Sequence, residues 1–136
     1  MARTSIEHIT HSILSVQHAL GQAKRDRDAE IVETKLFIGL NDAETKTQKF
    51  DVDQYVSVLN RVCVEYGVPF SFDVINGGYI HDDGEYTEEN TIELSFINIE
   101  KKTVDRIAQD LCTFFNQESV LITEDRVKVR SVCQYA

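Results

Sequence analysis

Three cations alternate near the end of the chain: Arg126, Lys128 and Arg130, separated by Val127 and Val129. Successive side chains of a strand point to opposite faces, so a strand here would place all three cations on one face. Arginine's planar guanidinium suits phosphate oxygens bidentately. The spacing therefore predicts a phosphate-binding strand. The alternative is an edge strand that is kept soluble by charge and is paired with carboxylates.

Side chains that recognise a nucleotide base flank an acidic segment, HDDGEYTEE. Tyr79 precedes it and Asn90 follows it, and such aromatic rings and amides bind bases by stacking and hydrogen bonds. Arg106 is a further candidate phosphate ligand. Its helical neighbour Asp110 would instead neutralise it in a surface pair.

Other chemistry finds less support. The carboxylates of the acidic segment could serve acid–base catalysis or bind calcium, but they lack the EF-hand pattern, which favours a solvated loop. His8 and His11 are three residues apart with no matching third ligand. The chain has no phosphate-binding Gly-x-x-x-x-Gly-Lys loop, no Gly-x-Ser-x-Gly elbow and no His-Glu-x-x-His pair. We therefore expect no catalytic residue, no metal and no cofactor.

Hydrophobic periodicity predicts the elements that position these residues. In the central hairpin, apolar residues such as Ile92, Leu94 and Phe96 alternate with polar ones. The elements expected in chain order are an amphipathic helix over 4–20, a strand over 31–41, a helix over 51–67, a hairpin over 70–99, a helix over 100–116 and strand material over 119–132.

This order predicts an α+β fold: a ferredoxin-like βαββαβ antiparallel sheet with an additional N-terminal helix. We expect one globular domain. Residues 1–29 form the helix and a charged linker, and residues 30–136 form the α+β ligand-binding part.

Some apolar residues are out of phase with the main core. They are Phe37, Ile75, Ile97, Leu121 and Val132. A monomer that covers only one face of its sheet would expose several of them. The first helix, over 4–20, is surplus to the βαββαβ plan and either covers this second face or pairs with another subunit. We therefore predict a homo-oligomer.

The overall charge limits the partners. With 136 residues and a net charge of -9, the chain is unsuited to nucleic-acid polymers and anionic membranes. It has no apolar run of membrane-spanning length, and the residues MARTSIEHITHSIL do not resemble a signal peptide. Cys63, Cys112 and Cys133 are odd in number and far apart, so we expect reduced thiols in a cytosolic protein.

The order and character of these elements resemble a phage family, the Thoeris anti-defence proteins of the first type. The resemblance covers residues 30–132. It rests on KLFIGLND, DVDQYVSVLNRV, GGYIHDDGEYTEENTIELSF and the basic last strand. The segment LFIGL followed by a helix also resembles small bacterial proteins of unknown function that are often exported, a comparison that the lack of a signal peptide weakens.

The phage resemblance implies a protein that does no chemistry. Its members are homo-oligomers in the host cytoplasm that bind a cyclic ADP-ribose isomer between subunits, and some also bind cyclic oligonucleotides. They keep the signal from its effector. By position, Tyr79 or Ile80 would contact adenine and Asn90 would add a polar contact. Phosphates would meet the cations Arg106, Arg126, Lys128 and Arg130.

Two other functions stay open. The acidic composition also fits an inhibitor that binds a host nucleic-acid-binding or defence protein through its carboxylates. A small metal-dependent enzyme that uses the acidic segment is the third hypothesis.

Overall fold

Six elements make up the part of the chain that the computed structural model describes, residues 31–80, 82–130, 132 and 134. They are β1 (Ile31–Gly39), α2 (Val52–Tyr66), β2 (Ser71–Ile80), β3 (Tyr86–Ile97), α3 (Lys101–Phe114) and β4 (Leu121–Val127). The expected helix over 4–20 and the linker to residue 29 lie outside the described residues.

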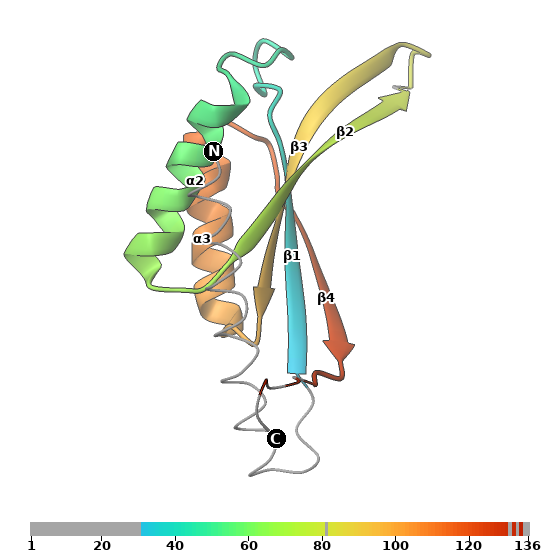
Figure 1. Cartoon of the computed structure of the whole chain (residues 1–136). Helices are drawn as coiled ribbons and strands as arrows, with labels where there is room; N and C mark the ends of the chain where they lie inside the picture. Colours follow the sequence, from blue (N-terminus) through green and yellow to red (C-terminus); the bar gives the residue numbers. More distant parts are fainter. Residues whose placement is uncertain (1–30, 81, 131, 133, 135–136) are drawn as a thin grey trace.

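The four strands form one sheet in the order β2-β3-β1-β4, and each neighbouring pair is antiparallel. Both helices cover the same face (Figure 1). The structure confirms the α+β class and the antiparallel sheet. We call the side of the sheet opposite the helices the open face.

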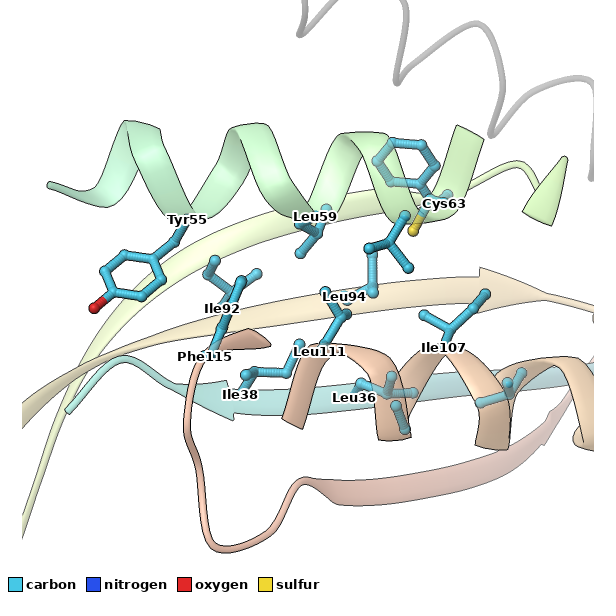
Figure 2. Close-up of a cluster of buried hydrophobic side chains, with 14 of the residues drawn as sticks. Leu36, Ile38, Tyr55, Leu59, Cys63, Ile92, Leu94, Ile107, Leu111 and Phe115 are labelled. Atoms are coloured by element: carbon cyan, nitrogen blue, oxygen red, sulfur yellow. The ribbon is translucent and has the colours of Figure 1, made fainter. Parts of the chain in front are cut away.

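The core lies between the sheet and the two helices. Leu36 and Ile38 of β1 alternate with outward residues and are fully buried, as are Ile92 and Leu94 of β3. Leu59 of α2 packs into the same cluster (Figure 2). Each such side chain contributes about 1.5–3 kcal/mol when fully buried.

Helix α2 has the ends that its sequence predicts. The Asp51 N–H donates to Oε1 of Gln54 at 2.9 Å in a capping box. Gly67 ends the helix at φ 66, a left-handed conformation that glycine adopts without a steric penalty. The cap holds the β1–α2 connection at one end of the sheet, beside the hollow described below.

Strand β4 is shorter than expected. It passes straight through Glu124 and Asp125, which pair with β1, and ends at Val127. Lys128 and Arg130 therefore lie beyond the strand, and the prediction that one strand face carries all three cations is wrong. Arg126 pairs with Val32, a register position on the helix side of the sheet.

The open face carries the apolar residues that were out of phase. Phe37 pairs with Leu121, and the register places Ile75 and Ile97 on the same face. Leu121 is 63% exposed. Val132 lies past the last strand. The apolar open face is thus confirmed, whereas the oligomer that it suggested stays a prediction.

The β2–β3 hairpin projects past the ends of both helices (Figure 1). Its pairing is continuous through Gly77 and Gly78, so the glycines form no bulge. The ring of Tyr86 occupies the space where a Cβ of Gly78 would lie. No helix among the described residues is long and apolar enough to cross a membrane.

Candidate functional site

A hollow of about 640 Å³ lies on the open face, at the end of the sheet from which the hairpin projects. Pockets for small molecules range from about 300 to 1,000 Å³. Its walls come from the end of β1, the β1–α2 connection, the hairpin and the α3–β4 connection. The lining residues are Phe37, Gly39, Asn41, Asp42, Ala43, Lys46, Asp83, Glu85, Thr87, Glu89, Thr91, Gln117, Glu118, Ser119 and Leu121.

The carboxylate of Glu89 lies against the backbone of Gly39. A Cβ at Gly39 would stand 2.5 Å from Oε1 of Glu89 and 2.6 Å from Oε2. Glycine is therefore required for this approach. The backbone N–H of Asn41 donates to Oε2 at 3.0 Å, which fixes the carboxylate at the wall of the hollow.

Asp42 organises the β1–α2 connection. It is only 5% exposed, and its Oδ1 accepts the N–H groups of Glu44 at 2.9 Å and Thr45 at 3.1 Å. Its Oδ2 accepts Nδ2 of Asn116 at 2.9 Å and lies 3.3 Å from Nζ of Lys49. The Asn116 amide, followed by these other donors, holds the pKa of Asp42 well below its usual range. The aspartate is therefore ionised at neutral pH.

The same contacts join two connections that are far apart in sequence. The Ala43 N–H donates to the Asn116 carbonyl at 2.9 Å, and Nε2 of Gln117 donates to the Asn41 carbonyl at 2.7 Å. Asn116 adopts φ 48, a left-handed conformation that asparagine tolerates. Both connections line the hollow, so these bonds set the distance between two of its walls.

The lining is strongly acidic. It contains five carboxylates, namely Asp42, Asp83, Glu85, Glu89 and Glu118, against one lysine among the described lining residues, Lys46. The Glu118 carboxylate lies 3.3 Å from Nζ of Lys46, with both side chains exposed. Because Lys46 pairs with Glu118 and Lys49 pairs with Asp42, the excess negative charge rests on Asp83, Glu85 and Glu89. A partly enclosed site with this excess attracts cations and repels phosphates.

Further along the open face, β1 carries a second lysine. Nζ of Lys35 lies 3.2 Å from Oε1 of Glu93 and 3.7 Å from Oε1 of Glu33. The hydrogen bond to Glu93 is the main reason that its pKa is raised. Lys35 is therefore engaged by strand neighbours and adds no positive charge to the lining.

Asn90 points away from the hollow. Its Oδ1 accepts Nδ2 of Asn76 at 3.1 Å, and its Nδ2 donates to Oε1 of Gln48 at 2.9 Å. Ile92, two residues further along β3 and on the same side of that strand, faces the core. The amide that was expected to read a base here joins the hairpin to the β1–α2 connection.

Ile80 and Tyr79 lie near the hairpin tip. Ile80 pairs with Tyr86 and is 72% exposed. Tyr79 pairs with Thr87, a residue that lines the hollow. The exposed side chain of Ile80 does not line the hollow.

The expected phosphate ligands lie elsewhere. Arg106 is on the exposed side of α3, and its neighbour Asp110 accepts the hydroxyl of Tyr66 at 2.7 Å. Arg126 lies opposite Val32 near the start of β1, whereas the hollow lies where β1 ends, at Gly39 and Asn41. Lys128 follows it beyond the strand. Within one chain the structure does not bring these cations to Tyr79, Ile80 or Asn90.

The hollow combines carboxylates of the acidic segment, which the sequence offered as candidates, with residues that it did not single out, such as Gly39 and Asp42. Gly39 interrupts a β-branched and aliphatic strand, a signal of close backbone approach. Glu89 belongs to the acidic segment, which we expected to be solvated. Asp42 and Asn116 are 74 residues apart. Their contact has no sequence signal because it depends on how the two connections meet.

Comparison with solved structures identifies the class of fold. A phage SAM lyase in complex with S-methyl-5′-thioadenosine superposes with a TM-score of 0.55, at 21% identity over 78% of this chain and 92% of that chain. A phage SAM lyase in the apo state gives 0.54, at 21% identity over 79% of this chain and 92% of that one. No protein-family model and no curated protein matches the sequence.

These neighbours correct one expectation. The sequence predicted a protein without enzymatic activity, whereas the two solved structures described above are of an enzyme, a phage SAM lyase. The earlier inference depended on the lack of motifs for nucleophiles, phosphate loops and zinc. A lyase needs none of those motifs, so their absence does not exclude catalysis. The likeness to phage proteins is one of fold.

Proposed function

We propose that this protein is a phage-type lyase that cleaves S-adenosylmethionine and releases S-methyl-5′-thioadenosine. The observation that carries the proposal is the acidic hollow. At neutral pH, S-adenosylmethionine has a sulfonium, an ammonium and a carboxylate, and therefore one net positive charge. Five carboxylates around one lysine suit such a ligand. The fold shared with phage SAM lyases supports the same assignment.

The charge change during the reaction fits this site. Comparison of the two molecules identifies the broken bond, which joins the sulfonium sulfur to the methionine chain. Its electron pair stays on sulfur, which becomes a neutral thioether. The remaining fragment either closes onto its own carboxylate or loses a proton to a base. The acidic lining thus holds the cationic substrate more strongly than the neutral adenosine product.

Glu89 is the residue that we place against the sulfonium. Its Oε2 is held by the Asn41 N–H, while Gly39 allows the carboxylate to lie close to the strand. A charge that is fixed before the ligand arrives requires little reorganisation on binding. Phe37 and Leu121 pair across the strands at the same wall and offer apolar contact for the adenine ring.

Several coarser inferences extend this proposal. We assign the strand order β2-β3-β1-β4, with one helix in each β-α-β unit, to the ferredoxin-like plan. S-adenosylmethionine is a methyl donor, so its cleavage would act against host defences that rely on methylation. The anti-defence role expected from the sequence is compatible with this activity. Action in the host cytoplasm and assembly into a homo-oligomer stay predictions.

The sponge for a cyclic ADP-ribose isomer has less support. Its phosphates would face the carboxylates of the hollow, and none of the four cations expected to bind them lines it. A cyclic ADP-ribose isomer therefore serves as the comparison ligand in the test.

The test is incubation of the purified full chain with S-adenosylmethionine, followed by chromatography. We expect S-methyl-5′-thioadenosine to accumulate. Glu89→Gln should lower kcat/KM at least about tenfold, the effect of losing one charged contact. Glu44→Gln is the matched control, because Glu44 is exposed and does not line the hollow. Absence of the product, together with binding of a cyclic ADP-ribose isomer, would overturn the proposal.

A further inference from the structure

We propose that Lys46 binds the carboxylate at the amino-acid end of the substrate. This inference rests on the proposed function, and it names which part of the ligand lies at the rim of the hollow. The lining has five carboxylates but one lysine among the described residues. S-adenosylmethionine likewise combines cationic groups with a single carboxylate. The site thus offers carboxylates to the cationic groups of the substrate and one lysine to its carboxylate.

The backbone at Lys46 is strained in a way that a surface lysine does not require. Its φ is 61, whereas the other non-glycine residues with positive φ in the described chain are both asparagines, Asn98 and Asn116. Lysine has no side-chain group that favours this left-handed conformation. Such strain persists where the surroundings fix it, and it concentrates at functional sites.

The surroundings do fix Lys46. Its N–H donates to the Asp42 carbonyl at 2.8 Å, and the Asp42 N–H donates to the Thr47 carbonyl at 2.8 Å. The Asp42 carboxylate is anchored in turn to Asn116. Hydrogen bonds through Asp42 therefore hold the turn at Lys46 against both the β1–α2 and the α3–β4 connections, which are two walls of the hollow.

The present partner of Lys46 is one that a ligand can replace. Its Nζ lies 3.3 Å from Oε1 of Glu118, and the two side chains are 67% and 77% exposed. Exposed pairs of this kind contribute little. A substrate carboxylate that is already held in the hollow would compete well with Glu118, because the rest of the ligand keeps it close.

Three ligands that undergo no cleavage separate the parts of the site. S-methyl-5′-thioadenosine lacks the amino-acid group, S-adenosylhomocysteine has that group on a neutral sulfur, and sinefungin has the group and a nearby cationic amine. The affinity for S-adenosylhomocysteine relative to S-methyl-5′-thioadenosine reports on Lys46. The affinity for sinefungin relative to S-adenosylhomocysteine reports on Glu89. Calorimetry on the full chain measures all three.

The variant Lys46→Asn removes the cation and keeps a residue that tolerates positive φ. We expect S-adenosylhomocysteine to bind it about tenfold more weakly and S-methyl-5′-thioadenosine to bind within about twofold of wild type. Thermal stability should be equal to or above that of wild type, which shows that the fold is intact. Lys101→Asn is the control, since Lys101 pairs with Asp105 on α3 and lies outside the hollow.

Each outcome is decisive. Loss of the preference for S-adenosylhomocysteine in Lys46→Asn, with the sinefungin ratio unchanged, supports the assignment. A retained preference in that variant overturns it, as does a wild-type protein that never prefers S-adenosylhomocysteine over the thioadenosine. Failure of wild type to bind any of the three ligands overturns the proposed function itself.

Discussion

Replacement of Gly39 by Ala tests how the strand positions the Glu89 carboxylate. The new Cβ would stand 2.5 Å from Oε1 of Glu89, whereas ordinary contact begins at 3.4 Å. The carboxylate must therefore retreat by about 3.4 − 2.5 = 0.9 Å. A movement directly away from Asn41 would lengthen the bond from the Asn41 N–H to Oε2 from 3.0 Å to at most about 3.9 Å, beyond hydrogen-bonding distance.

The expected cost in stability is small, and the expected cost in activity is large. Loss of a charged hydrogen bond costs about 1.5–3 kcal/mol when buried, and about 1 kcal/mol at this partly exposed site. Alanine also makes the unfolded chain less flexible than glycine does, and this stabilises the fold by about 0.4–1 kcal/mol and offsets part of the loss. The free energy of unfolding should therefore fall by less than about 1 kcal/mol. A displacement near 1 Å in a positioned group lowers kcat/KM about tenfold to a hundredfold.

The matched control is Gly77→Ala. A Cβ at Gly77 meets no atom within 4 Å, and this residue lies on the same sheet. Urea unfolding and the release of S-methyl-5′-thioadenosine are measured for both variants. If Gly39→Ala keeps the activity of Gly77→Ala, the contact between Gly39 and Glu89 has no role in the site and the reasoning is refuted.

Three further predictions concern the folded chain. Leu94→Ala should lower the free energy of unfolding by about 2–5 kcal/mol in urea titrations, because Leu94 is fully buried in the core, and a loss below 1 kcal/mol would contradict this. The lowered pKa of Asp42 stabilises the fold above its unfolded value of 3.8, and this contribution is lost as the pH falls toward the folded pKa. The stability difference between wild type and Asp42→Asn should therefore shrink from pH 7 to pH 3, and a constant difference would show that charge is not its source. Burial raises the pKa of the Cys63 thiol to about 12, so mass spectrometry should find Cys63 unmodified by iodoacetamide at pH 8 until urea unfolds the chain, and rapid native labelling would be inconsistent with its burial.

Much of the fold could be predicted because its signals are local. The alternation of Leu36 and Ile38 with polar residues indicates which side of β1 is buried, and Gly67 stops α2 through its own backbone freedom. The same periodicity placed Phe37 and Leu121 on the second face, and the register confirms this. Alternation of this kind can be recognised within a single short segment, without knowledge of the rest of the fold.

The end of β4 was harder to predict. Arg126, Lys128 and Arg130 alternate as strand residues do, yet β4 stops at Val127, opposite Ile31, the first residue of β1 that the structure describes. A strand needs a neighbour to bond as well as an alternating pattern. The alternation of charges gives no information about that neighbour.

What the sequence determined by itself is the set of elements, their buried faces and the net charge, since each depends on residues near one another or on composition alone. The tertiary structure decided which charges gather. It brings Glu89 onto Gly39 and joins Asp42 to Asn116 across 74 positions, while Arg106 and Arg126 do not line the hollow. Electrostatic attraction depends on distance in space, so a basic strand in the sequence and an acidic hollow in the fold can occur in the same chain.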